Sequence, residues 1–252
     1  MSGFKTLMYH DIISREDFSE EKRGPICVAD GYQDTLPPFL FTYLEDFREQ
    51  MRYLKEEGWH TLTLAEIQDF YENKAVLPEK SVHLTFDDLY KSVAMYVIPI
   101  LREYGFKATG FCVKSWVFNK PQPYDALHPT TLSWTELADI HDVLELANHS
   151  DSLHQRIGEV SSILSWSKED VISDLASCSE KIDNPFFFAY PFGIYNKETL
   201  ERLESAGIRY AYTSDPGLNN PDTNPLELYR CFAPLGTDRE GFAAILDLGE
   251  HL

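Results

Sequence analysis

Short apolar runs alternate with longer amphipathic segments along the whole chain. The short runs are rich in aromatic and β-branched residues and end in polar or turn-forming residues, as buried strands do. This alternation predicts repeated β–α units and an α/β fold around a mainly parallel sheet. The expected strands, enough for a barrel, cover residues 5–9, 59–62, 82–86, 108–113, 144–148, 186–190, 209–213 and 229–232.

Amphipathic segments between these strands predict helices. In residues 44–57, Phe47, Met51 and Leu54 recur at helical spacing, and Gly58 follows as a C-terminal cap. Two polar stretches that contain prolines, 14–38 and 117–131, are expected to be long loops beside a binding face. Further helices are expected at residues 90–104, 167–182 and 197–206.

The whole chain, residues 1–252, is expected to form a single domain. Barrels of the α/β class commonly reach this length as one unit, and no internal repeat, low-complexity tract or linker divides the sequence. Four cysteines show no paired spacing and are expected to be buried free thiols: Cys27, Cys112, Cys178 and Cys231.

Acidic residues outnumber basic ones by 41 to 22, which gives a net charge of -19. That charge repels phosphate backbones and anionic lipid surfaces, so nucleic acid is not an expected partner. The excess suits a substrate that gains positive charge during a reaction. It also fits ordinary solubilising charge, which is the commoner explanation.

The sequence contains no candidate for a membrane span, because no run approaches the roughly 18 apolar residues that a span requires. The first residues, MSGFKTLMYH, lack the apolar core of a secretion signal. The sequence as given therefore predicts a cytoplasmic protein. A sequence trimmed of its signal would instead belong to an exported protein.

Two adjacent carboxylates, Asp87 and Asp88, follow the apolar run 82–86. Barrels of the α/β class place catalytic groups at this carboxyl end of a strand. Because neighbouring strand residues point to opposite faces, one carboxylate could bind a cation while the other handles protons. Alternatively, the two aspartates cap the helix that follows.

Two histidines, His149 and His154, follow the expected strand 144–148. At this spacing they do not share a helical face, and they converge only if a turn lies between them, as where a strand passes through a turn into a helix. Neutral imidazoles together with a carboxylate suit zinc or a similar divalent ion, and three protein ligands leave a position open for water. On its own, the pair also fits ordinary surface histidines.

A turn signal, Tyr190-Pro191-Phe192-Gly193, follows the aromatic strand at 186–190. Such a turn can aim backbone N–H groups at a developing oxyanion while the aromatic residues flank a sugar ring. Proline and glycine at these positions also fit a plain turn.

A further histidine, His10, closes the first expected strand and should face the same end of the sheet. An imidazole there is a candidate general acid, because its ordinary pKa lies near neutrality. A structural histidine is the alternative.

The runs 85–88, 149–154 and 190–193 together resemble, in order and spacing, the motifs of the polysaccharide deacetylases, the NodB-like carbohydrate esterase family 4. The opening run Tyr9-His10-Asp11-Ile12, the stretch 47–54 and Gly58-Trp59 resemble its poly-β-1,6-N-acetylglucosamine deacetylase branch. The resemblance covers about residues 5–235. It implies a distorted, incomplete (β/α) barrel, commonly of seven parallel strands with surrounding helices, so one expected strand would be an edge element.

The resemblance also implies a metal site. Asp88, His149 and His154 correspond to the metal ligands, and Asp87 corresponds to the base that takes a proton from the attacking water. The implied cofactor is a divalent metal, with zinc first and cobalt, nickel, iron or manganese as alternatives.

The remaining implied roles concern the oxyanion and the leaving amine. The backbone N–H of Phe192 corresponds to the oxyanion donor of the family, and His10 corresponds to the proposed acid of the branch named above. Many other members take that acid from a histidine near the C-terminus. His251 is the late candidate here, and its place next to the chain end makes it a poor one.

Three features depart from the family pattern. Leu89 stands where the family usually has glycine after the paired aspartates, which changes the turn below the site. The arginine that often precedes the Pro-x-Gly motif is absent, although Arg230 could reach inward from the last strand. Many relatives are exported, whereas a cytoplasmic one would more naturally act on a carrier-linked sugar or an oligosaccharide precursor.

These features predict a metal-dependent enzyme that hydrolyses the N-acetyl group of an amino sugar in a polysaccharide, oligosaccharide or carrier-linked precursor, releasing acetate. Two alternatives remain: a related amidase acting on a non-sugar C–N bond, and a non-catalytic carbohydrate-binding module on the same scaffold. Acetate release from a panel of acetylated substrates separates the two enzymes, and absence of bound metal would favour the binding module.

Overall fold

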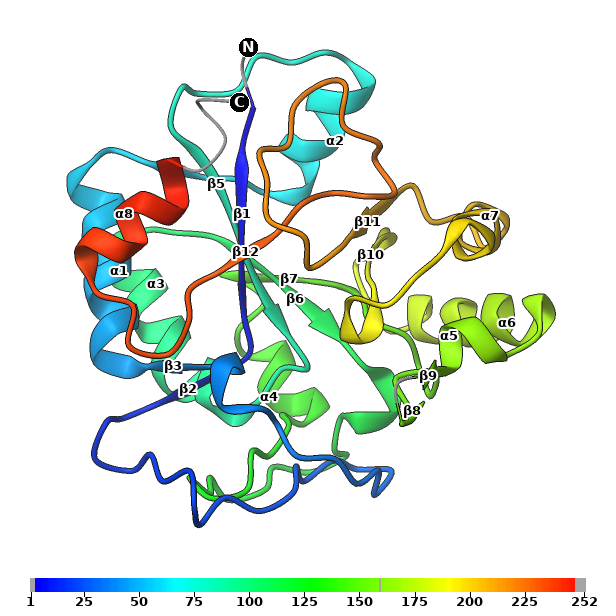
Figure 1. Cartoon of the computed structure of the whole chain (residues 1–252), viewed down its shortest axis with the longest axis horizontal. Helices are drawn as coiled ribbons and strands as arrows, with labels where there is room; N and C mark the ends of the chain where they lie inside the picture. Colours follow the sequence, from blue (N-terminus) through cyan, green and yellow to red (C-terminus); the bar gives the residue numbers. More distant parts are fainter. Residues whose placement is uncertain (1–2, 159, 248–252) are drawn as a thin grey trace.

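A parallel sheet is the central feature of the computed structural model, which describes residues 3–158 and 160–247 (Figure 1). Its seven principal strands stand in the order β11-β10-β7-β6-β5-β1-β12 and curl into a half-barrel with helices around it. The predicted fold class is therefore confirmed. The bounds of these strands are β1 Lys5–Tyr9, β5 Ser81–Asp87, β6 Ala108–Cys112, β7 Leu144–Asn148, β10 Asn184–Ala189, β11 Tyr210–Tyr212 and β12 Cys231–Phe232.

The expected strand at 59–62 is the edge element. It is present as β4, His60–Thr61, which pairs only with the first residues of β5. Further along β5, the same side of that strand pairs with β6. Four short strands form two separate two-stranded sheets that the sequence pattern did not reveal: β2 Asp11–Ile13 with β3 Phe41–Tyr43, and β8 Arg156–Ile157 with β9 Val160–Ser161.

Helices α1, α3 and α8 cover one side of the sheet, and α5, α6 and α7 lie on the other side of the view (Figure 1). Their bounds are α1 Leu44–Glu56, α2 Leu64–Glu72, α3 Ile98–Tyr104, α4 Trp134–Ala138, α5 Ser162–Ser165, α6 Lys168–Ser179, α7 Lys197–Ser205 and α8 Arg239–Asp247. Three 3-10 turns complete the list: η1 Pro38–Leu40, η3 Lys114–Trp116 and η4 Pro191–Gly193.

The expected helix at 90–104 is confirmed, because residues 91–104 are helical throughout, although its first half is not regular α-helix. A π-helical turn, η2 Val93–Val97, precedes α3. Pro99 explains the wider turn, because proline has no N–H to donate and its ring crowds the carbonyl four residues earlier.

Alternation along β5 directs one set of side chains outward and the other inward. Val82, Leu84 and Phe86 pack in the core cluster that contains α1 and α3. His83 lies on the opposite face, where its Nε2 is 2.8 Å from Thr109 Oγ1 and its ring contacts that of Tyr212. Asp87, which ends β5, belongs to this inner set, so the outer hydrophobic packing is what aims its carboxylate into the half-barrel.

The carboxyl ends of the principal strands share one edge, and the two long loops gather there (Figure 1). The loops hold each other, since Gly24 N donates to Leu127 O and Cys27 N donates to Pro129 O, both at 2.8 Å. Residues 26 and 34–37 of the first loop line the cavity described below. Both loops therefore lie at the edge of the sheet that bears the cavity, as expected, although residues 117–131 support the first loop and do not line the cavity.

All four cysteines are free thiols, as expected. Cys27 is exposed rather than buried, because it lies in the outer loop and not in a strand. None of the described helices combines the length and the apolar character needed to cross a bilayer.

Leu89 adopts a left-handed conformation, with φ of 59°, in the position where glycine was expected. Its side chain is buried, and Gly110 on β6 provides the room: a Cβ atom there would lie 2.6 Å from Leu89 Cδ2 and 2.8 Å from Leu144 Cδ2. The turn therefore persists with a leucine because the neighbouring strand has no side chain at that point.

We predict that Gly110→Ala lowers the free energy of unfolding by about 1–3 kcal/mol, the usual cost of overpacking a core. In a Leu89→Ala background the same change should cost less, since one of its two clashes is gone. Urea denaturation of the four proteins of this double-mutant cycle measures both costs. An equal cost in both backgrounds would contradict the packing described here.

Candidate active site

Four strand ends meet at one cavity of about 350 Å³. β5, β7 and β10 lead directly into Asp87-Asp88, His149 and Tyr190, and β1 leads into His10. The cavity wall includes six of the polar residues singled out in the sequence: His10, Asp87, Asp88, His149, His154 and Arg230.

Asp88 turns away from the strand direction, because its φ is 64°, in the left-handed region. Its carboxylate is buried, and Oδ2 accepts a 3.0 Å hydrogen bond from the Tyr90 hydroxyl. Among the described residues, Oδ1 has no hydrogen-bond partner. That oxygen instead lies 3.7 Å from His149 Nε2 and 3.5 Å from His154 Nε2.

His149 is held with one defined nitrogen toward Asp88. Its Nδ1 lies 2.8 Å from the carbonyl oxygen of Ala189 on β10. A carbonyl can only accept, so Nδ1 carries the proton and the Nε2 lone pair of the neutral ring points to the Asp88 carboxylate. The imidazole is thereby prepared to act as a ligand.

His154 reaches the same point after a sharp turn. Ser150, directly after His149, has φ of 84°, which reverses the chain. The His154 ring is buried between Trp116 and Phe192, with centroid distances of 4.5 Å to each. The expected turn is present, but the chain continues into β8 rather than into a helix.

Asp88, His149 and His154 can therefore each offer one ligand atom, and these atoms lie within 4.8 Å of one another. Burial lowers the pKa of both histidines, which keeps them in the neutral form that binds metals. Burial, and then the neighbouring Asp87 charge, raises the pKa of Asp88 to about 8. Two imidazoles and a carboxylate with an unpartnered buried oxygen fit a divalent cation such as zinc.

Asp87 has a different environment from its neighbour. Burial by itself raises the pKa of Asp87, but Arg230, His149 and His10 outweigh it and hold that pKa below its usual range. Arg230 Nη1 donates to Asp87 Oδ1 at 2.7 Å, and Arg230 Nε donates to the Thr213 carbonyl oxygen at 2.8 Å. The arginine missing from the Pro-x-Gly motif thus has a counterpart from the opposite side of the half-barrel.

The second oxygen of Asp87 faces the two remaining imidazoles. Oδ2 lies 3.8 Å from His10 Nε2 and 3.9 Å from His149 Nε2. Burial lowers the pKa of His10 to about 4, although the Asp87 charge opposes this, so His10 is neutral near pH 7. His251, the late alternative, lies outside the described residues.

The Pro-x-Gly turn lies against the same cavity. Phe192 has φ of 60°, and its ring contacts His154. The Tyr190 hydroxyl donates to the Leu226 carbonyl oxygen at 2.8 Å, and its ring stacks on Tyr195, so Tyr190 is held by structure outside the site. Pro191 is buried at the start of the turn.

Several cavity residues were not identified from the sequence. Tyr90 follows Asp88 by two positions, but only the two left-handed residues at 88 and 89 bring its hydroxyl back to the carboxylate. Arg156 pairs with Asp34 of the first long loop at 3.0 and 3.2 Å and lies over the Phe192 ring. No local pattern signals these contacts, because they join distant segments.

By its fold and its site, this chain is a half-barrel α/β protein with a histidine–carboxylate cluster at the carboxyl ends of its strands. The chain is a member of the polysaccharide deacetylase family, since the model of that family matches residues 74–211, more than half of the chain. The name of this family describes proteins that remove acetyl groups from polysaccharides.

The chain is also similar to two curated relatives and to two solved structures. Poly-beta-1,6-N-acetyl-D-glucosamine N-deacetylase of Staphylococcus aureus is 26% identical over 186 residues, which are 71% of this chain and 62% of that protein. YxkH of Bacillus subtilis, named for the same family, is 26% identical over 208 residues, 81% of this chain and 69% of that protein. The chain thus spans less than two thirds of the staphylococcal enzyme.

The structures share the fold along nearly the full chain. The Streptococcus pyogenes deacetylase PplD, solved in complex with acetate, has a TM-score of 0.77 at 20% identity and covers 97% of this chain and 98% of its own. IcaB from Ammonifex degensii has a TM-score of 0.75 at 18% identity, with 98% and 97% covered. At these identities the likeness concerns the fold.

We predict that the protein binds one zinc ion per chain and that His149→Ala and His154→Ala each weaken binding by more than about a hundredfold, since even an outer-shell change costs 10–100-fold. Competition titration with a chromophoric chelator measures the affinity. His128→Ala is the control, because this half-buried histidine pairs with Asp125 and is not among the residues that line the cavity. Equal affinity in all four proteins would exclude the cluster as the binding site.

Proposed function

We propose that the protein is a metal-dependent N-deacetylase that releases acetate from an N-acetylated amino sugar within a glycan. The observation that carries this proposal is the position of a prospective cation cluster, Asp88, His149 and His154, directly beside the buried Asp87–Arg230 pair. A cluster for binding alone has no need of the second, ionised carboxylate. The names of the staphylococcal relative and of the acetate-bound structure support the same chemistry.

In this proposal Asp88, His149 and His154 hold the divalent cation, with zinc as the expected metal. A cation in that position lowers the pKa of water and polarises a carbonyl group, which an amide requires because it resists attack by bulk water. The chain's other groups then manage protons and orientation.

Asp87 is the proposed base. Arg230 occupies its Oδ1 and keeps the carboxylate ionised, so Oδ2 is the oxygen that accepts the proton of the attacking water. The water oxygen bonds to the acetyl carbon, the C–N bond breaks, and acetate leaves with the oxygen. The proton held by Asp87 is then available to the departing amine.

His10 and Phe192 complete the proposed machinery. His10 is neutral, and its Nε2 is next to the proton-accepting oxygen of Asp87, so His10 is placed to relay the proton taken up by Asp87 to the amine. The backbone N–H of Phe192, in the strained turn of η4, is the proposed donor to the developing oxyanion.

The mouth of the cavity supports a glycan as substrate. Phe39 and Phe232 line it with 54% and 38% of their surface exposed, and their ring centroids are 6.2 Å apart. Exposed aromatic faces beside a polar site are suited to the apolar faces of sugar rings. We propose that a sugar unit next to the one that is deacetylated contacts these rings.

We predict that Asp87→Asn lowers kcat for acetate release by about 10²–10⁴-fold, the usual contribution of a general base. The substrate is a β-1,6-linked N-acetylglucosamine oligomer, and zinc content is measured on the same samples. Asp142→Asn, at an exposed ion pair with Arg102, is the control. Undiminished turnover by Asp87→Asn with zinc bound would disprove the assignment of the base.

We further predict that Phe39→Ala and Phe232→Ala raise KM for the oligomer by about twofold to tenfold, as expected for loss of one ring contact. The value of kcat should change little, because neither ring reaches the ligand cluster. Phe186→Ala provides the comparison, since Phe186 is 44% exposed on β10 outside the cavity. If all three variants keep the wild-type KM, the sugar does not use this mouth.

A further inference from the structure

The segment between the two histidines must keep an unusual shape. His149 and His154 are five residues apart, yet their ring centroids are only 4.6 Å apart. The reversal depends on the left-handed Ser150, a conformation that costs a non-glycine residue free energy unless its surroundings enforce it.

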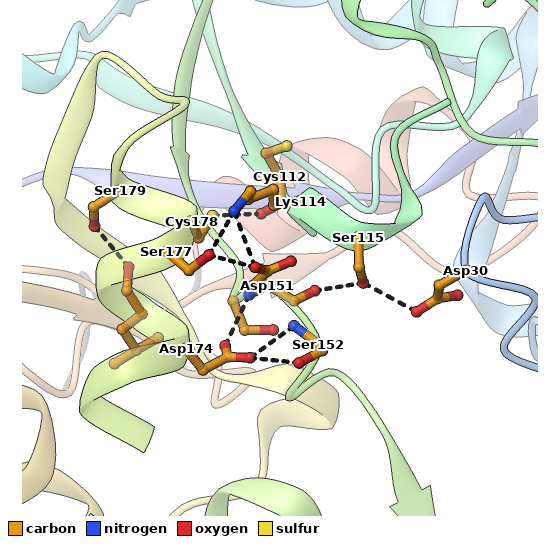
Figure 2. Close-up of polar contacts among 12 residues, drawn as sticks. Asp30, Cys112, Lys114, Ser115, Asp151, Ser152, Asp174, Ser177, Cys178 and Ser179 are labelled. Carbon is orange, nitrogen blue, oxygen red and sulfur yellow. Dashed lines mark hydrogen bonds and ion pairs between the residues drawn. The ribbon is translucent and has the colours of Figure 1, made fainter. Parts of the chain in front are cut away.

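Asp174 on α6 binds this segment from one side (Figure 2). Its Oδ1 accepts the backbone N–H of Asp151 at 2.8 Å. Its Oδ2 accepts the backbone N–H of Ser152 at 2.7 Å and the Ser152 hydroxyl at 2.9 Å. One buried carboxylate therefore receives three hydrogen bonds from two consecutive residues of the segment.

Lys114 and its neighbour Ser115 hold the segment from the other side (Figure 2). The Lys114 backbone N–H donates to Ser150 O at 3.0 Å, and Lys114 Nζ donates to Asp151 Oδ2 at 3.1 Å. Ser115 Oγ donates to Asp151 O at 2.6 Å. The segment is thus fixed between η3 and α6.

The helix that carries Asp174 is itself attached to β7, the strand that leads into His149. Asn148 Nδ2 donates to Leu175 O at 2.9 Å, and Asn148 Oδ1 accepts the Ser150 backbone N–H at 2.7 Å. Asp174 is therefore held in a fixed position relative to the end of β7. Its hydrogen bonds fix the backbone of Asp151 and Ser152 relative to the same strand end.

We propose that Asp174 is a positioning residue: by fixing the backbone of Asp151 and Ser152, it holds His149 and His154 at the separation that a shared cation requires. Asp174 acts through the backbone and belongs to none of the groups that line the cavity. The inference rests on the proposed function, because it presumes that the two histidines bind the same ion.

Asparagine in place of Asp174 tests the inference with almost no change of shape. The amide keeps one acceptor, loses the charge, and presents N–H donors to a site that already contains donors. Asp174→Asn should weaken zinc affinity by about tenfold to a hundredfold, as removal of outer-shell partners does. The readout is a zinc titration against a competing chelator, together with thermal unfolding of the metal-free proteins.

Two control variants on α6 separate positioning from general stability. Glu169→Gln makes the same chemical change at an exposed position of the helix and should leave zinc affinity unchanged. Val171→Ala removes buried side-chain volume from the core beneath α6, a core that also contains Leu153 of the segment, and leaves all three hydrogen bonds of Asp174 in place. It should lower the unfolding temperature yet retain zinc affinity within about twofold.

Zinc affinity of Asp174→Asn within twofold of wild type, or reduced no more than in Val171→Ala, overturns the inference while the proposed function stands. A wild-type chain that binds no zinc overturns the proposed function and this inference with it. Should Asp174→Asn fail to fold, Ser152→Ala removes one of the three hydrogen bonds, and it must still weaken zinc affinity by at least threefold.

Discussion

Two neighbouring carboxylates buried at the end of one strand are the constraint on which the site depends. Like charges in a low-dielectric interior cannot both ionise unless each has compensation. Arg230 compensates Asp87 from the last strand, whereas Asp88 has a phenolic hydroxyl on one oxygen and two imidazoles facing the other. Asp87 is thus stabilised as an anion by Arg230, whereas Asp88 has, among the described residues, no cationic side chain bonded to it and would be stabilised as an anion by a bound cation.

The fold satisfies this constraint by bringing separate segments to one edge. The apolar face of β5 packs on α1 and α3, which leaves Asp87 on the inner face, and the left-handed Asp88 turns its carboxylate toward the end of β7. His149 is oriented by a carbonyl of β10, and the turn to His154 is enclosed between η3 and α6. A rigid scaffold around a small polar centre is what binding and catalysis at a preorganised site require.

Much of this arrangement could be predicted from the sequence, because strand periodicity and the residues that follow each strand are local signals. The position of His10, Asp87, Asp88 and His149 at one edge follows from parallel strands, whereas that of His154 also requires the turn at Ser150. The left-handed turn at Leu89 could not be predicted, since it depends on the absence of a side chain at Gly110 in another strand.

The same limit explains the other differences. The π turn before α3 follows from Pro99, yet its extent depends on packing. The Tyr90, Arg156 and Asp174 contacts join residues whose spacing carries no periodic signal.

The most direct measurement of where the cation binds is anomalous diffraction at the zinc edge from crystals of the zinc-loaded protein. The account predicts one strong peak in contact with Asp88 Oδ1, His149 Nε2 and His154 Nε2, and stoichiometric zinc located elsewhere would contradict it.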